Sequence, residues 1–301
     1  TAEDGGATVS KRAPTGFILA FLLPPLLLYG TLVLLPAVNA FRFSLTRWDG
    51  LSDPVWVGLA NFGKILAQRS DFLAALQHNL FLMFVPGAII LSLALFFAYV
   101  IHQRVWGARL FRVAFFFPNV ISSVAVALLW VLVYSTTDVG LLNNVLKMWF
   151  GQKEPIAFTA SSHLLWALVP MLVWAATGFY MVLFLAAMEN IPDSFYEAAR
   201  LDGASSAALF RYVTLPLIWE VLTTGVIFQV IGGLKIFDAI WVMENGRPTP
   251  ATHTISTLMY SKVFEEYNIG YGTAVAVLLF VLVLLATMLS FRLMRRERLE
   301  Y

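Results

Sequence analysis

Long apolar runs and short charged loops alternate along the whole chain. Five runs of 23 to 25 residues contain no Asp, Glu, Lys or Arg, and a sixth contains only Glu220. Each run exceeds the roughly 20 residues that an α-helix needs to cross the hydrocarbon core of a bilayer. The runs are continuously apolar rather than alternating with a period of two, which argues against a β-barrel. The pattern predicts an all-α integral membrane protein with six transmembrane helices at 17–41, 79–101, 113–137, 164–188, 213–234 and 269–291.

The composition agrees with a membrane protein. Of 301 residues, 59% are hydrophobic and 13% are charged, whereas a soluble domain has about 25% charged residues. This balance excludes a soluble globule, a disordered chain and a coiled coil. The formal net charge of +2 gives no indication of a nucleic acid partner. The chain has no Cys, and its four His lie in different loops without metal-ligand spacing, so neither a disulfide nor a metal site is expected.

Lys and Arg close to the spans indicate the orientation of the chain. The loop 103–112 carries three Arg and no acidic residue, and the segment 292–301 carries four Arg. Because short loops rich in Lys and Arg stay in the cytoplasm, both termini (1–16 and 292–301) and the loop 189–212 are predicted to be cytoplasmic. Segment 1–16 lacks the form of a signal peptide, so the first apolar run is expected to be retained. On the outer side, 61–77 is expected to form a short surface helix, and four Trp near span ends are expected to be interfacial anchors: Trp48, Trp56, Trp149 and Trp241.

The loop 189–212 contains signals for two short helices. Pro192 suits the start of a helix, and Ser194 with Glu197 has the spacing of a capping box. Gly203 supplies the left-handed conformation that ends a helix, and a second short helix is expected after it. Such a hairpin, with small residues on one face, either docks in a groove of another protein or packs on its own bundle. The residues alone leave both interpretations open.

The same loop resembles a known family motif. Its spacing is that of the EAA loop in permease subunits of binding-protein-dependent ABC importers, carried here by Glu197, Ala198, Ala199, Gly203, Val213, Leu215 and Pro216. The neighbouring Asp202 and the segments 57–62 and 235–238 resemble the sugar-permease branch, and within it the maltose-F-type subunits. The resemblance extends over 17–291 and implies the type I ABC importer permease fold, with a cytoplasmic coupling helix in 189–212.

The resemblance implies a multi-subunit importer. Its expected partners are a second homologous permease, two ATP-binding cassette ATPase subunits, an extracytoplasmic solute-binding protein and the lipid bilayer of a bacterial or archaeal cytoplasmic membrane. ATP and Mg are expected on the ATPase subunits, and no cofactor is expected on this chain. The residues implied to couple ATP hydrolysis to transport are Glu197, Ala198, Ala199, Asp202, Gly203, Leu215 and Pro216. For Glu197 a simpler role remains open, in which its carboxylate only caps its own helix.

Residues at helical spacing in the fourth and fifth runs are candidates for a substrate path: Trp174, Thr177, Tyr180, Gln229 and Gly233. Aromatic faces with nearby amides and hydroxyls suit a sugar, whose C–H face stacks and whose hydroxyls need partners. The resemblance implies sugar contacts at four of them: Thr177, Tyr180, Gln229 and Gly233. Helix packing remains the alternative for the glycine and for Tyr180. At the outer end of the fifth run, Lys235 and Asp238 either pair with each other or line the outer mouth of the path.

Two rival classes of protein fit the sequence less well. An ion-coupled carrier or channel needs charged groups inside the bilayer, and the spans hold only Glu220, which lies near the cytoplasmic end and is expected to be water-accessible or ion-paired. A membrane enzyme needs a convergent set of acid, base or metal ligands, which the spans lack. The segment 58–64 imitates a phosphate-binding loop, but Ile65 replaces the required Ser or Thr. The sequence therefore predicts a non-catalytic permease, a small neutral carbohydrate as substrate and an external source of energy.

Overall fold

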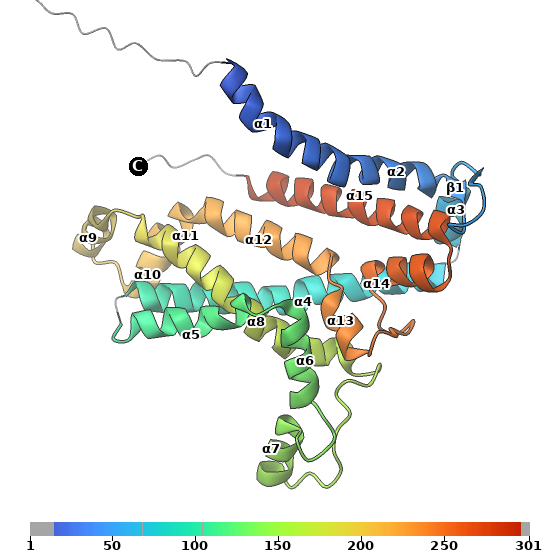
Figure 1. The fold of residues 1–301 in the computed structure, drawn as a ribbon. Helices are drawn as coiled ribbons and strands as arrows, with labels where there is room; N and C mark the ends of the chain where they lie inside the picture. Colours follow the sequence, from blue (N-terminus) through green and yellow to red (C-terminus); the bar gives the residue numbers. More distant parts are fainter. Residues whose placement is uncertain (1–14, 68, 104, 296–301) are drawn as a thin grey trace, which may run out of the picture.

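Long apolar helices run side by side in one bundle (Figure 1). A computed structural model describes residues 15–67, 69–103 and 105–295. Within them, four helical segments are long and apolar enough to cross a membrane by themselves, and two further pairs of helices pass the same test together although each pair is bent. The four are Leu19–Ser44, Asp71–His102, Leu164–Glu189 and Ile269–Met294. The prediction of six spans agrees with this part of the chain if each bent pair counts as one span.

The elements follow one another with short connections. The first half contains α1 (Thr15–Tyr29), a π-helical turn (Gly30–Leu34), α2 (Leu35–Ser44), β1 (Thr46–Arg47), β2 (Val55–Trp56), α3 (Ala60–Ala67), α4 (Arg69–His102), α5 (Ala108–Val120), α6 (Ser123–Val133) and α7 (Leu141–Phe150). The second half contains α8 (Leu164–Glu189), α9 (Asp193–Leu201), α10 (Ser206–Leu209), a π-helical turn (Phe210–Thr214), α11 (Leu215–Leu217), α12 (Trp219–Leu234), α13 (Asp238–Met243), α14 (Ile255–Tyr260), a π-helical turn (Ser261–Glu265) and α15 (Ile269–Met294). Apart from the antiparallel hairpin of β1 and β2, the described structure is helical, as predicted.

The third predicted span is not one continuous helix. Instead of a helix over 113–137, α5 and α6 meet at an angle of 98°. Ile121 is extended, and the hydroxyl of Ser122 accepts a hydrogen bond from the N–H of Ala125, so a new helix begins after Ser122. As a result α6 and α7 leave the bundle sideways (Figure 1).

The fifth predicted span begins later than expected. The helical segment Ser206–Leu217 meets α12 at 73°, so α12 starts at Trp219 rather than at 213. Pro216 has no N–H for the helical ladder, and Ile218 leaves helical geometry with φ −91° and ψ 6°. The break divides the entrance segment from the part of the run inside the bundle.

The outer segment 61–77 also differs from its prediction as one surface helix. Only α3 is a separate short helix. α4 begins at Arg69 and continues without interruption to His102, so the second half of the segment is an extension of the second span.

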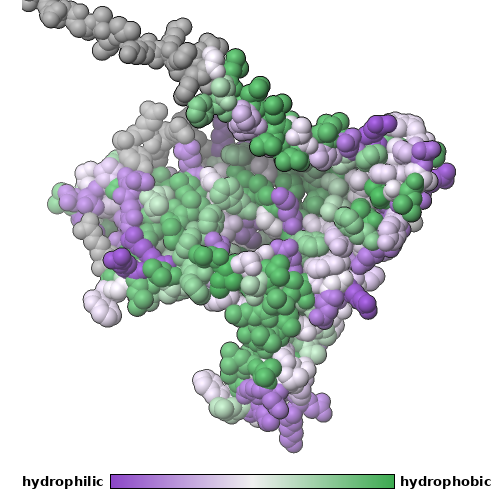
Figure 2. Space-filling model, viewed as in Figure 1, coloured by the Kyte–Doolittle hydropathy of each residue, from purple (hydrophilic) through white to green (hydrophobic). Residues whose placement is uncertain are grey.

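The central pair of helices is α4 and α8, and the buried core surrounds it. Toward α9 the core contains Met181, Phe184 and Met188, each with 0% of its surface exposed. Toward α6 and α13 it contains Leu82, Leu168 and Ile240. The first span, in contrast, exposes most of its apolar side chains, and Figure 2 shows apolar surface along α1 and α6. Such a surface suits lipid or another membrane protein rather than water.

The two ends of the bundle are distinct in Figure 1. The start of α1, the end of α15 and the helices α9 and α10 lie at one end, and β1, α3 and α14 lie toward the other. This arrangement puts both described chain ends on the side of the loop 189–212.

The four predicted Trp anchors are in different environments. Trp56 and Trp149 are 65% and 75% exposed. The indole of Trp48 donates to the carbonyl of Ser52 at 2.7 Å, and Trp241 stacks on Phe237 with 5.3 Å between ring centroids. Their role at a membrane surface stays a prediction.

Candidate functional site

The first helix of the loop 189–212 is α9, and its start differs from the predicted capping box. Pro192 occupies the N-cap position, with φ −58° and ψ 137°, and makes no side-chain cap bond. Ser194 therefore lies inside the helix, and Glu197 lies in its second turn. With Pro192 as N-cap, the carboxylate of a capping box would stand at position 195, so Glu197 lies two residues too far along the helix for that role.

The end of α9 agrees with its prediction. Gly203 has a φ of +81°, the left-handed conformation that glycine adopts without steric cost. Its N–H donates to the carbonyl of Arg200 at 3.0 Å, and the N–H of Ala204 donates to the carbonyl of Ala199 at 3.0 Å. The chain then turns into α10, where the hydroxyl of Ser205 caps the helix by accepting from the N–H of Ala208.

Tyr196 anchors this hairpin to the bundle. Its side chain is buried, its hydroxyl lies 3.1 Å from the hydroxyl of Thr214, and its ring centroid lies 5.5 Å from that of His102. Burial raises the pKa of Tyr196 above its ordinary value, so the hydroxyl stays neutral. A second link joins α4 to α10, because the hydroxyl of Tyr99 donates to the carbonyl of Ser206 at 2.8 Å.

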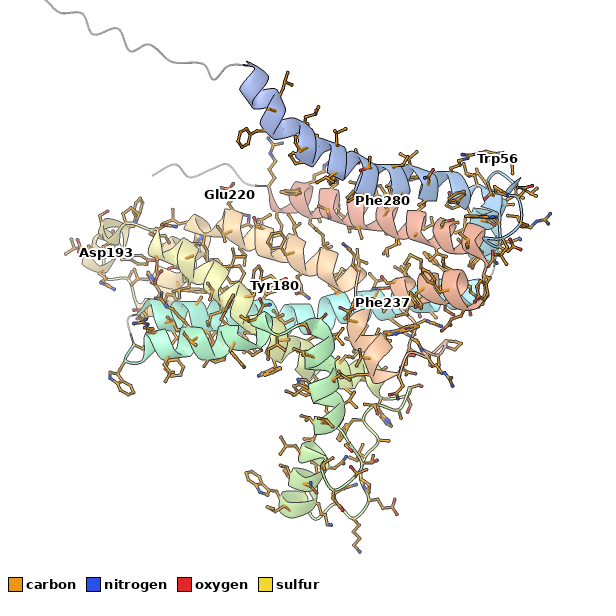
Figure 3. The ribbon with its side chains drawn as sticks, viewed as in Figure 1. Trp56, Tyr180, Asp193, Glu220, Phe237 and Phe280 are labelled. Carbon is orange, nitrogen blue, oxygen red and sulfur yellow. The ribbon has the colours of Figure 1, made fainter. Side chains whose placement is uncertain are left out.

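The outward surface of the hairpin carries most of the predicted coupling residues. The exposed residues of the loop include Glu197, Ala198, Leu201, Asp202 and Gly203. Ala199 is half-buried, as are Leu215 and Pro216 in α11. Leu201 is 89% exposed and was not singled out by the sequence, although an apolar residue directly before a helix-ending turn is a usable signal. The hairpin thus combines an anchored inner side with small and apolar residues on its outer side (Figure 3, near Asp193).

A cavity lies beneath α9, on its inner side. It has a volume of about 700 Å³ and separates α9 from the facing ends of α4 and α5. Tyr196, Glu197 and Arg200 line it from α9. On the opposite wall, Arg112 of α5 forms an ion pair with Glu189, the last residue of α8.

Four of the predicted path residues lie where helices pack against each other. Thr177 is buried and donates within α8 to the carbonyl of Val173 at 2.6 Å. Tyr180, near the middle of the bundle in Figure 3, is 6% exposed and lies close to Phe184. Gln229 contacts α4 at Gly87, and a Cβ on Gly233 would come within 2.6 Å of the Cα of Met83. These positions bring α4, α8 and α12 close together.

The remaining path residues are accessible from outside the chain. Trp174 is 39% exposed, and Lys235 is exposed at the end of α12. Asp238 is half-buried and accepts a hydrogen bond from the hydroxyl of Ser123, which joins α13 to α6. The described structure has no ion pair between Lys235 and Asp238.

The accessible face of α12 is rotated from the predicted one. Phe228, Gly232 and Lys235 follow each other at i, i+4 and i+7, and all three are exposed. A Cβ on Gly232 would meet no described atom within 4 Å, in contrast to the neighbouring Gly233. Helical spacing cannot tell these two faces apart, because each carries one of the two adjacent glycines, Gly232 and Gly233.

One further position, Asn79, was not recognised from the sequence, whereas Glu220 was expected to be accessible to water or ion-paired. The buried amide of Asn79 donates to the carbonyls of Gly233 and Leu234, and its oxygen accepts from the N–H of Ile255. Asn79 thereby joins α4, α12 and α14, and the presence of an amide in an apolar run was the available signal. Glu220 is exposed in the first turn of α12, where the positive end of the helix dipole favours a carboxylate.

Comparisons with known proteins agree on one kind of protein. Residues 90–298 match the family described as the binding-protein-dependent transport system inner membrane component. A probable ABC transporter permease of Pyrococcus horikoshii is 32% identical over 283 residues, which cover 92% of this chain and 96% of the relative. The diacetylchitobiose uptake system permease NgcF of Streptomyces coelicolor is 34% identical over 91% of this chain and 81% of its own length.

Another relative and a crystal structure extend the likeness over the whole fold. The trehalose/maltose transport system permease MalF of Thermococcus litoralis is 32% identical, over 96% of each chain. A chain in the crystal structure of a bacterial ABC transporter involved in the import of the acidic polysaccharide alginate superposes with a TM-score of 0.78. The match covers 93% of this chain and 96% of that one at 24% identity, so it concerns the fold alone.

Proposed function

This chain belongs to the family of binding-protein-dependent transport system inner membrane components, and from that premise we propose that it carries a neutral mono- or oligosaccharide across the membrane. It is a multi-pass permease subunit of an ABC importer. The substrate class is supported by relatives named for diacetylchitobiose and for trehalose and maltose. None of the relatives reported above is an ion-coupled carrier or a channel.

The hairpin of α9 and α10 is the proposed coupling element and is the observation that carries the proposal. Its outer side exposes Ala198 and Leu201, Glu197 is exposed at the edge of the cavity beneath α9, and Tyr196 holds the inner side. A small-residue helix face allows close approach to a partner, and an exposed Leu supplies an apolar contact. In this role the hairpin seats in an ATPase subunit, with Asp202 and Gly203 shaping its turn and Leu215 and Pro216 leading into α12.

The subunits of the proposed assembly have different roles. Two ATP-binding cassette subunits bind and hydrolyse ATP with Mg, and this chain acts as a non-catalytic permease beside a second, homologous permease. An external solute-binding protein delivers the sugar to the end of the bundle that carries β1 and α14. The side of α9 and of both described chain ends is then the cytoplasmic side of a bacterial or archaeal membrane.

Trp174, Gly232 and Lys235 are the proposed path-facing residues of this chain. The exposed ring of Trp174 offers a stacking surface for the C–H face of a sugar. Gly232 leaves room for a neighbour outside this chain, and the ammonium of Lys235 donates hydrogen bonds at the outer end of α12. Four other predicted path residues would act indirectly, by fixing the spacing of α8 and α12 next to the path: Thr177, Tyr180, Gln229 and Gly233.

Transport by the reconstituted complex tests this function. The proteoliposomes contain both permeases, the ATPase subunits and the loaded binding protein. They are expected to transport labelled sugar only when ATP is supplied on the side of the membrane that carries the ATPase subunits. An ionophore that collapses ion gradients is expected to leave uptake unchanged. Uptake by this chain without ATPase subunits, driven by an ion gradient, would contradict the proposal.

A further inference from the structure

An ion pair joins two spans at the point where the loop 189–212 leaves the bundle. Nη2 of Arg112 donates to Oε1 of Glu189, across 77 positions of the chain. Arg112 lies in the second turn of α5, and Glu189 is the last residue of α8, four positions before α9 begins. The two side chains are 41% and 46% exposed, so the pair is accessible to water and its partners are held by geometry rather than by burial.

The cavity under α9 makes this pair important for the transmission of movement. Residues of α9 line one wall of the 700 Å³ cavity, and residues of α4 and α5 line the facing wall. Tyr196 of α9 packs on His102 of α4, whereas open space lies between α9 and this part of α5. A displacement of α9 is therefore not passed directly to this part of α5, and reaches it through Glu189 and the short connection of Asn190, Ile191 and Pro192.

A second attachment lies further along the same two helices. A Cβ on Gly178 would come within 1.9 Å of the carbonyl oxygen of Phe115, so α5 and α8 touch backbone to backbone there. Gly178 and Glu189 are 11 positions apart on α8, which is roughly 16 Å along the helix axis. Ala108 and Phe115 of α5 also pack against the core that α8 lines, and the pair of Arg112 with Glu189 adds a polar attachment at the end of this helix pair next to the coupling loop.

The far end of α5 leads to the outer side of the bundle. After Val120 the chain bends by 98° into α6, and the hydroxyl of Ser123 at the start of α6 donates to Asp238 of α13. A movement of α5 is therefore delivered to the elements beside the outer end of α12. This route is separate from the direct connection of the loop to α12 through α11.

We propose that Arg112 and Glu189 form a clamp that makes α5 move with the coupling loop, and that both are positioning residues for the coupling of ATP hydrolysis to transport. This rests on the proposed coupling role of α9. The guanidinium uses one donor in the clamp, and its Nε is buried without a hydrogen-bond acceptor in the described structure. One charge-assisted bond therefore forms this polar attachment, and removing either charge leaves only the apolar packing of α5 on α8 at this end.

The ratio of sugar transported to ATP hydrolysed, measured in the full complex, tests the clamp. Arg112→Gln and Glu189→Gln are each expected to lower this ratio by about three- to tenfold, or about 0.7–1.4 kcal/mol at 1.4 kcal/mol per factor of ten, while ATP hydrolysis continues. The charge swap of Arg112→Glu with Glu189→Arg is expected to restore most of the ratio. Arg109→Gln removes the same charge from an exposed position on α5 and is expected to leave the ratio unchanged.

A distance measurement keeps the test decisive if a variant assembles poorly. The chain has no Cys, so spin labels at Ala114→Cys on α5 and Ala186→Cys on α8 report only this helix pair. The distance distribution is expected to stay narrow with and without ATP, and to broaden in Arg112→Gln. An unchanged ratio and an unchanged distribution in Arg112→Gln would overturn the clamp while leaving the coupling loop intact. Absence of ATP-driven transport by the unmodified complex would instead overturn the proposed function.

Discussion

Tyr196 shows how one buried side chain can fix the orientation of a surface loop. Its ring fills the space between His102 and Thr214, and its hydroxyl meets that of Thr214 at 3.1 Å. The neighbouring Ala198 is left exposed on the other side of the same helix, and Glu197 is exposed at the edge of the cavity. Burial of one position thus holds the helix so that its neighbours face a partner.

The substitution Tyr196→Phe isolates the hydroxyl bond from the packing of the ring. It is expected to lower the free energy of unfolding by about 1 kcal/mol, the net value of a typical hydrogen bond, and to reduce the sugar transported per ATP. Tyr212→Phe is the matched control, since Tyr212 lies after the same hairpin and is 72% exposed. Equal thermal stability and equal coupling of the two variants would show that the Tyr196–Thr214 contact contributes nothing.

Among the helices, α12 shows how one element presents different faces to two different surroundings. Gly233 is in contact with the backbone of α4 at Met83, whereas Gly232 faces open space in the described chain. Adjacent glycines of one helix thus have opposite surroundings. The first is explained by packing inside the chain, and the second is left for a partner or a substrate.

Alanine at these two positions separates the roles. Gly233→Ala is expected to destabilise the protein, because a Cβ 2.6 Å from the Cα of Met83 forces α12 and α4 apart. Gly232→Ala is expected to keep or raise stability, by up to about 1 kcal/mol from helix propensity, and to lower sugar uptake. Thermal unfolding of purified protein and uptake in proteoliposomes measure the two effects. Greater instability in Gly232→Ala would contradict the assigned faces.

The turn after α9 offers a second matched pair. Gly203 and Gly107 have φ values of +81° and +80°, in two connections at the same end of the bundle. Alanine at either position adopts a left-handed conformation at a cost of about 1–2 kcal/mol, and both variants are expected to lose similar stability. Only Gly203→Ala is expected to lower the sugar transported per ATP, since its turn shapes the coupling loop. A similar loss of coupling in Gly107→Ala would assign the effect to general instability.

For the whole molecule, the helical bundle could be predicted from local features of the sequence. Runs without charges that are long enough to cross a bilayer locate the helices, and Gly203 locates the end of α9. Both described chain ends lie at the same end of the bundle as the loop 189–212, which agrees with the prediction from the distribution of Arg that they share one side. The family motif in that loop agrees with the match over residues 90–298.

Other features depend on contacts between distant segments and are not visible in a local pattern. The bend at Ser122 interrupts a run whose hydropathy is suitable for one helix, because a polar cap inside an apolar run does not change its mean hydropathy. Which of Gly232 and Gly233 is buried depends on the position of Met83, 150 positions earlier in the chain. The pairing of Arg112 with Glu189 likewise requires the packing of α5 on α8.

The most direct test of the account is a photocrosslink from the coupling loop in the assembled importer. A benzophenone label on Ala198→Cys, in a chain that has no other Cys, is expected to capture an ATPase subunit. The same label on Leu51→Cys, 93% exposed at the opposite end of the bundle, is expected to capture none. A complex that transports sugar normally yet gives no ATPase adduct from position 198 would contradict the account.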